Sequence, residues 1–286
     1  RCPPKPYIRE SLRLRAMAML RQQWTTGWSG NAVNYADVMP HDGIACWQFE
    51  YDFHPTRREF LDAGRTDGPW TTAFRPGRTW GPPYSGRALF PARSVVPERV
   101  DGLLGAQKNL GYSSIVSSAV RLHDQSVAIG QGVGALAALS LNEQVAPRAV
   151  PEDRRLMNRL WSELGRRHGD SAPVLLWPFR DLAPEHSAFA AVQQLAIRRM
   201  LPLGPQEVDF RADAPATAEW STAVQRATAT QLAVDPPDVG EIAGLTRGDF
   251  ARRWWEQVCE LPLRPWVRSD ARDADLDGVP DHDDPL

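Results

Sequence analysis

The clearest hydrophobic pattern along the chain predicts a long helix from about residue 124 to residue 141. Asp124 is a residue type that often caps a helix N-terminus. The apolar residues beyond it are Val127, Ile129, Val133, Leu136, Leu139 and Leu141. Three glycines lie inside this pattern, and each costs about 1 kcal/mol relative to alanine in a helix interior. Gly130 and Gly134 share one face of the helix. We therefore expect a strand, another helix or a flat ligand to lie against that face.

The rest of the pattern predicts short strands and further helices. Loose alternation predicts a strand over residues 42–53, and another strand is expected over residues 89–96. Residues 12–20 indicate a strand-to-helix segment. Helices are predicted over residues 151–167, 185–200 and about 215–232, and a last helix is predicted to begin at Thr246.

Two familiar interpretations of the glycine-rich helix are excluded. The segment GQGVGA, residues 130–135, is not a dinucleotide-binding fingerprint, because that motif directly follows a strand. Residues 121–125, which precede it, read RLHDQ and have no strand pattern. The apolar run 127–141 also falls short of the roughly 20 residues that span a bilayer. We expect no transmembrane segment.

Composition excludes several classes of partner. The 286 residues carry a formal net charge of −2, so no basic surface argues for nucleic acid and no charge excess argues for a membrane surface. The cysteines Cys2, Cys46 and Cys259 are far apart, which favours neither a zinc site nor a disulfide framework. The sequence begins without a methionine or a signal-like apolar segment. We interpret the chain as a C-terminal fragment.

Five segments, in this order, resemble the FAD-dependent oxidoreductases that are common in environmental bacteria. They are PYIRESLRL (6–14), DGIACWQFEYDFH (42–54), YSGRALFPARSVVPERV (84–100), VDGLLGAQK (100–108) and AVRLHDQSVAIGQGVG (119–134). The resemblance covers residues 6 to about 169. Gln107 stands where the family usually has glycine.

The resemblance implies an α/β fold, in which part of a Rossmann-like FAD-binding domain accompanies part of an α+β substrate domain. It places a strand at residues 100–104 and the cofactor against the glycine-rich helix. The residues implied in FAD binding are Ala106, Lys108, Asp124, Gln125, Gly130 and Gly134. A βαβ unit with a glycine-rich phosphate loop is absent from the sequence, so the missing N-terminal half of the same protein is an expected partner.

Two residues before and at the start of this helix are candidates for chemistry. Arg121 could hold a substrate carboxylate with its two-pronged guanidinium group. It could equally pair with Asp101 or Asp124. His123 has a side chain that titrates near neutral pH and could transfer a proton, although a single histidine at a helix start is more often structural.

The segment after residue 169 resembles one S-layer-homology module. The matching motifs are Phe179-Arg180-Asp181, Phe210-Arg211-Ala212-Asp213 and the helix start Leu245-Thr246-Arg247-Gly248-Asp249-Phe250. Such modules usually act in tandem on cell-wall polymer. The alternative is a small helical module that packs on the enzyme and binds nothing, because likeness of fold is a weak argument for function.

The C-terminal tail contains the spacing of a calcium loop. The residues DADLDGVPDHDD resemble EF-hand loops and thrombospondin type 3 repeats. A calcium loop needs oxygen ligands at alternate positions and a glycine at its sharp turn. The expected ligands are the side chains of Asp273, Asp275, Asp277, Asp281 and Asp284 and the carbonyl of Val279. A solvated acidic tail is the alternative.

Together these patterns predict a C-terminal part of an FAD-dependent oxidoreductase that acts on a small organic substrate. The expected division is a substrate-domain part (1–88), a closing FAD segment (89–170), a helical module (171–262) and a calcium-binding tail (263–286). We expect export to the periplasm or cell surface. The competing hypothesis is a cell-surface protein that anchors to cell-wall polymer through the module and the calcium loop.

Overall fold

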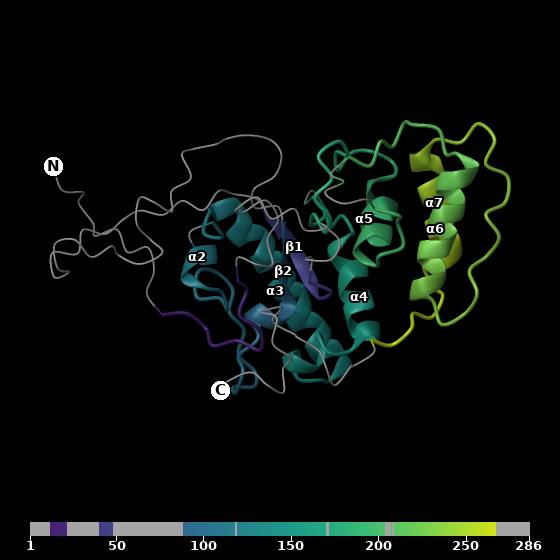
Figure 1. Ribbon diagram of the computed structural model, residues 1–286. Coiled ribbons are helices and arrows are strands. Elements are labelled where there is room, and N and C mark those ends of the chain that lie inside the picture. The colour runs from purple at the N-terminus through teal and green to yellow at the C-terminus, as the bar shows by residue number, and fades with distance from the viewer. Residues whose placement is uncertain are drawn as a thin grey trace, which may run out of the picture.

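The computed structural model describes residues 12–21, 40–47, 88–117, 119–169, 172–203, 207 and 209–266. The elements follow in the order β1 (Gly43–Trp47), β2 (Ala88–Pro91), the 3-10 helix η4 (Ala92–Val95), α2 (Ser114–Ser117), α3 (His123–Glu143), the 3-10 helix η5 (Pro147–Ala149), α4 (Arg154–Leu164), α5 (Phe189–Ile197), α6 (Ala218–Gln231) and α7 (Arg247–Val258) (Figure 1). In this part of the chain the one sheet pairs β1 with β2 in antiparallel fashion. The parallel Rossmann-type sheet that we expected is not seen among these residues, which form a mixture of helices and a small sheet.

Helix α3 packs on strand β1 through one apolar face. Ile129, Val133, Leu136 and Leu139 on this face are buried. Gly132 brings the helix close to the strand, because a Cβ atom at that position would lie 3.0 Å from the Cβ of Ile44. A side chain at residue 132 would therefore push the helix away from the sheet.

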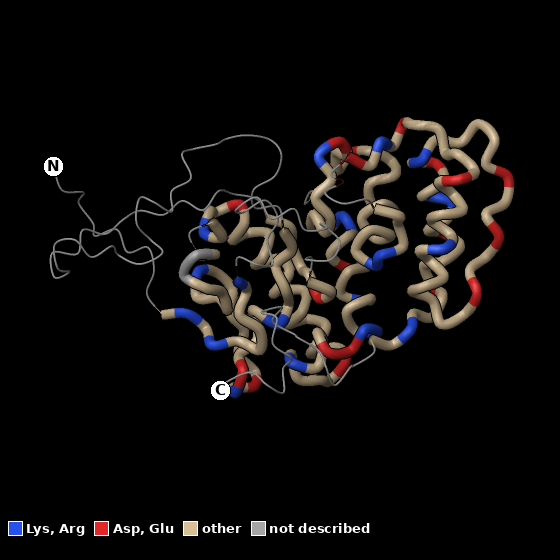
Figure 2. Tube along the Cα trace, in the orientation of Figure 1, with Lys and Arg blue, Asp and Glu red and all other residues tan. Residues whose placement is uncertain are grey.

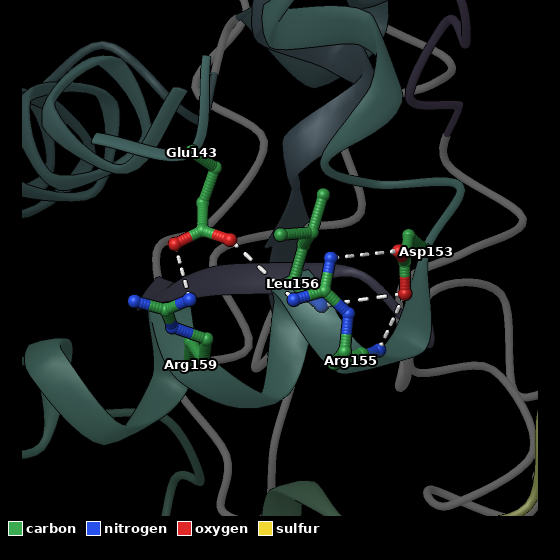
Figure 3. A network of polar contacts seen from close by, with 5 residues as sticks. All are labelled: Glu143, Asp153, Arg155, Leu156 and Arg159. Atoms are coloured by element: carbon green, nitrogen blue, oxygen red, sulfur yellow. Dashed lines mark hydrogen bonds and ion pairs between the residues drawn. The ribbon is translucent and has the colours of Figure 1, made fainter. Parts of the chain in front are cut away.

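Helix α4 begins at the carboxylate of Asp153 and is tied to the end of α3 (Figure 3). The Asp153 side chain accepts a hydrogen bond of 2.7 Å from the Arg155 backbone N–H, one of the donors that a helix N-terminus leaves unpaired. Glu143, the last residue of α3, forms ion pairs with Arg155 and Arg159 of α4. On its buried side, Trp161 donates from Nε1 to the Gly43 carbonyl at 2.8 Å, so α4 is also anchored to β1.

The C-terminal helices pack around a row of aromatic rings that belongs to the common core. Threonine side chains cap α6 and α7: Thr217 accepts from Trp220 N and Thr246 accepts from Asp249 N. The rings of Phe179, Phe210, Trp220, Phe250 and Trp254 follow one another at centroid distances of 5.5–6.1 Å. Asp181 accepts from the backbone N–H groups of Phe210 and Arg211, which joins the first two S-layer-like motifs.

A buried arginine joins this helical module to α4. Arg198, directly after α5, is 2% exposed and stacks between Trp161 of α4 and Trp255 of α7, at 5.6 and 4.7 Å from their ring centroids. Its guanidinium group donates to the Asn158 side chain and carbonyl, to Ser162 Oγ and to Gln194. Burial lowers the pKa of Arg198 to about 9, and nearby Arg154 contributes to this shift. The guanidinium stays charged at neutral pH and is stabilised by neutral acceptors and aromatic faces.

The predicted helices agree with the structure better than the predicted strands. Helices α3 to α7 occupy the predicted segments within a few residues at each end. The structure overturns the helix expected within residues 12–20, because the described residues 12–21 form isolated bridges instead. The strand expected at 89–96 ends at Pro91 and turns into η4.

The strand expected at residues 100–104 is also wrong. These residues form an irregular loop, with Val100 and Leu103 exposed by 53% and 51%. Gly102 has a φ angle of +73°, which a strand does not accommodate. An apolar run becomes a strand only where a neighbouring strand accepts its backbone hydrogen bonds. No such strand lies beside it within the described part of the chain.

No helix among the described residues is both long enough and apolar enough to cross a membrane.

Candidate flavin site

The loop from Gly105 to Gly111 is held at both ends by one short helix. The N–H groups of Gly105 and Gly111 donate to the carbonyl oxygens of Val95 and Ser94 in η4, each at 2.8 Å. Neither glycine tolerates a side chain well. A Cβ on Gly111 would lie 2.4 Å from the Ala16 Cβ atom, and one on Gly105 would lie 3.1 Å from the Asn109 carbonyl. The loop therefore has a fixed position and exposes Ala106 and Lys108 between its anchors.

A buried tyrosine stabilises the middle of this loop. The Tyr112 hydroxyl donates to the Lys108 carbonyl oxygen at 2.6 Å. Burial raises the pKa of Tyr112 to about 12, against the opposing effect of nearby Arg13. The phenol therefore keeps its proton at neutral pH and remains a hydrogen-bond donor to the loop.

The loop meets α3 at Gly130. A Cβ on Gly130 would lie 3.8 Å from the Ala106 carbonyl oxygen. Ala106 and Gly130, which the family resemblance links to FAD through separate motifs, are thus neighbours in the fold.

The N-terminus of α3 starts at His123, one residue before the expected cap Asp124. Leu122 occupies the cap position and has no side-chain acceptor, while the Gln125 side chain accepts from Leu122 N at 3.3 Å. Asp124 is exposed in the first turn, and Gln125 is buried. The first turn of a helix has a partial positive charge and suits an electron-rich group.

The structure separates the three glycines of α3 by role. Gly132 is the one that admits a strand, since its missing side chain lets β1 approach. At Gly134 a Cβ would meet no atom of the described chain within 4 Å, and Gly134 is exposed. Contact with another segment is thus seen at Gly130, where the Ala106 loop lies, and none is seen at Gly134 within the described residues. Among these residues the helix backbone is open at Gly134, and a flat group such as a flavin ring could approach it there.

The outer face of α3 is uncharged along most of its length. Its exposed residues between the helix ends are Val127, Gln131, Gly134, Ala138 and Leu141. Val127 and Leu141 are exposed by 63% and 79%. Charged residues of α3 occur only near its ends, at Asp124 and Glu143 (Figure 2). This face is more apolar than a solvated helix face usually is.

The candidate catalytic residues lie beside the start of α3. Arg121 is half-buried just before the helix, and His123 is its exposed first residue. Asp101, one of the partners considered for Arg121, forms an ion pair with Arg148. The structure thus brings Arg121 and His123 to the same end of α3.

The sequence patterns missed a buried ion pair between Asp42 and Arg93. Asp42 is fully buried and accepts from Arg93 N at 2.8 Å and from Arg93 Nε at 3.2 Å. Burial alone would raise the pKa of Asp42, but the Arg93 guanidinium and His41 hold that pKa below its usual value. The sequence does contain a signal for this pair: Asp42 directly precedes the apolar strand β1, and Arg93 lies just after the apolar strand β2.

The calcium-ligand candidates Asp273, Asp275, Asp277, Val279, Asp281 and Asp284 all lie outside the described residues. Within the described ranges, no group of three or more His, Cys, Asp or Glu side chains could hold a metal ion. The calcium loop therefore stays a prediction.

Comparison with known proteins agrees with the N-terminal resemblance. A family model described as FAD dependent oxidoreductase matches residues 1–164, which end with α4. No curated protein and no solved structure matches the chain significantly. The match contains the loop, the start of α3 and its glycine face, and it ends before the S-layer-like motifs. Because it covers more than half of the 286 residues, the chain belongs to the FAD-dependent oxidoreductase family.

Proposed function

We propose that this chain provides the closing part of an FAD-binding domain in an oxidoreductase that acts on a small organic molecule. The observation that supports this most directly is the contact between the Ala106 loop and α3 at Gly130. That contact brings a loop anchored at both ends against the N-terminal half of α3, near Gly130. Bound FAD would carry the electrons of the reaction, while the protein holds and tunes it.

We assign the N-terminus of α3 to the electron-rich edge of the flavin ring. The aligned peptide dipoles of this 21-residue helix favour negative charge at His123 and Asp124. Arg121 would bind an anionic substrate group, and His123 would hold or accept a proton at the same end. These proposed roles follow from the residue types of Arg121 and His123 and from their positions at the helix start.

We further propose that another segment of the same protein covers the outer face of α3. The sequence contains no strand followed by GxGxxG, which is the unit that usually holds the pyrophosphate of FAD. The uncharged exposed face at Val127 and Leu141 provides an apolar surface on which such a unit could pack. The N-terminal half of a complete FAD domain is the partner that fits both observations.

This function is tested by comparing flavin retention in two proteins. The full natural protein, including any residues upstream of Arg1, is expected to purify yellow and to lose its visible absorbance when a reductant is added. The 286-residue chain alone is expected to emerge colourless from gel filtration after incubation with FAD. Colourless full-length protein would refute the proposed function. Stoichiometric flavin on the 286-residue chain would refute the need for a second segment.

For the helical module we propose a supporting role rather than cell-wall binding. Its attachment through Arg198 to Asn158 and Ser162 makes it part of the same packed body as α4. The family match ends before it, at residue 164. Packing against α4 explains its presence without a ligand of its own.

For the tail we propose calcium binding through the five aspartates and the Val279 carbonyl named above. Titration calorimetry is expected to show calcium binding to the intact chain and none to a version that ends at Asp270. Magnesium is expected to bind much more weakly, because it needs a tighter octahedral shell and gives up water reluctantly. Equal heats from the two versions would rule out the loop.

A further inference from the structure

The position of the Ala106 loop relative to α3 is determined by β1. Asp42, just before this strand, holds η4, and η4 holds both ends of the loop. Ile44, within the strand, contacts α3 at Gly132. The two halves of the candidate flavin site are the Ala106 loop and α3. The loop is connected to Asp42 and α3 packs on Ile44, two residues further along the chain.

The connection from Asp42 to the loop is short and made of direct hydrogen bonds. Ala92 N donates to the Asp42 carbonyl at 2.8 Å, and Arg93 N donates to the Asp42 carboxylate at 2.8 Å. The next two residues, Ser94 and Val95, accept from Gly111 and Gly105. A shift of η4 would therefore move both anchors of the loop together.

The side-chain pair adds orientation to these backbone contacts. Arg93 directs Nε and one terminal nitrogen to the two carboxylate oxygens of Asp42, at 3.2 and 3.5 Å. Both side chains are almost fully buried: Arg93 is 8% exposed and Asp42 is 0% exposed. In a buried site such a two-point contact fixes the angle as well as the distance between the partners.

We propose that Asp42 and Arg93 are positioning residues for the flavin site, which set the loop at Ala106 and Lys108 against α3. This inference rests on the proposed function, since it concerns the cofactor that the loop and helix would hold. Among the described residues, the hydrogen bonds that connect this pair to the loop pass through η4.

The main test is the double variant Asp42→Leu with Arg93→Met in the full natural protein. Removing both charges together avoids an unpaired buried charge, and an apolar pair of similar volume is often tolerated in a protein core. The protein is expected to fold with a moderately lower melting temperature than the wild type, because the Arg93 backbone N–H loses its carboxylate acceptor. Its affinity for FAD is expected to fall by about tenfold or more, because small displacements of a binding constellation are costly.

Two readouts separate positioning from general stability. Hydrogen exchange at the Gly105 and Gly111 amides is expected to speed up, while exchange within α3 stays unchanged. The visible circular dichroism of bound flavin, which reports its surroundings, is expected to change. Arg93→Lys serves as the second variant, because it keeps the charge and the backbone contact. It is expected to fold and to weaken FAD binding less than the double variant, with a smaller spectral change.

Leu195→Ala is the matched control for stability. Leu195 is fully buried in α5, outside η4 and the loop. This variant is expected to melt at a lower temperature and still bind FAD with unchanged affinity, measured well below that temperature. The inference is overturned if the double variant and Arg93→Lys bind FAD as the wild type does, or if Leu195→Ala releases flavin equally. Wild-type protein that binds no FAD would instead refute the proposed function.

Discussion

Replacing Gly134 with valine is expected to abolish flavin binding by the full natural protein without unfolding the part of the chain described here. A Cβ at residue 134 would meet no described atom within 4 Å. Valine also has a somewhat better helix propensity than glycine. The described part of the chain therefore presents no steric obstacle to valine at residue 134. A cofactor or protein segment that packs closely on this face would reject it, because overpacking a tight contact typically costs about 1–3 kcal/mol.

Alanine at the same position is the more sensitive version of this experiment. Gly134→Ala is expected to stabilise the 286-residue chain by about 1 kcal/mol through helix propensity. In the full natural protein we expect it to lower the ratio of bound flavin to protein absorbance nonetheless. If Gly134→Ala keeps full flavin and raises the melting temperature, the glycine face is not a cofactor contact.

Gly132 provides the internal contrast. A Cβ there would lie 3.0–3.2 Å from three atoms of Ile44, so Gly132→Ala is expected to destabilise the 286-residue chain despite the better helix propensity of alanine. Thermal unfolding of the 286-residue chain distinguishes the two sites without any cofactor. A stabilising effect at residue 132 would contradict the close packing of α3 on β1.

Arg198→Ala is expected to destabilise the protein by about 3–5 kcal/mol, which is at the upper end of single-residue effects. The change removes the donors that satisfy Asn158, Ser162 and Gln194 and opens a cavity between Trp161 and Trp255. For a chain of this size the melting temperature should fall by roughly 10 °C.

Two further variants identify the origin of that loss. Arg198→Met keeps most of the apolar volume of the side chain. The stability of this variant is therefore expected to lie between that of the wild type and that of Arg198→Ala. Arg253→Ala, at an exposed position of α7, is expected to change stability by less than about 0.5 kcal/mol. If Arg198→Ala cost no more than Arg253→Ala, the buried guanidinium would not be what joins α4 to the helical module.

The elements that follow from local rules were predictable from the sequence. Helix α7 begins at the expected cap Thr246. Helices α4 and α6 begin about three residues after the expected starts, where Asp153 and Thr217 offer a side-chain acceptor to the first turn. Capping involves residues two or three positions apart, so it needs no knowledge of the rest of the fold. The family resemblance over residues 6–169 was likewise visible in the order of short motifs, and the match to residues 1–164 confirms it.

Only the tertiary structure decided which surfaces face inward. Helical periodicity places Gly130 and Gly134 on one face and Gly132 on another, but it does not say which face meets β1. The strand that the family resemblance implied at residues 100–104 is a loop, because strand formation depends on a neighbouring strand that these residues do not specify. Asp42 and Arg93 lie 51 residues apart, and their pairing follows from the register of β1 with β2. Local sequence determines where helices start, whereas the burial of charge and the close approach of glycine depend on contacts between distant segments.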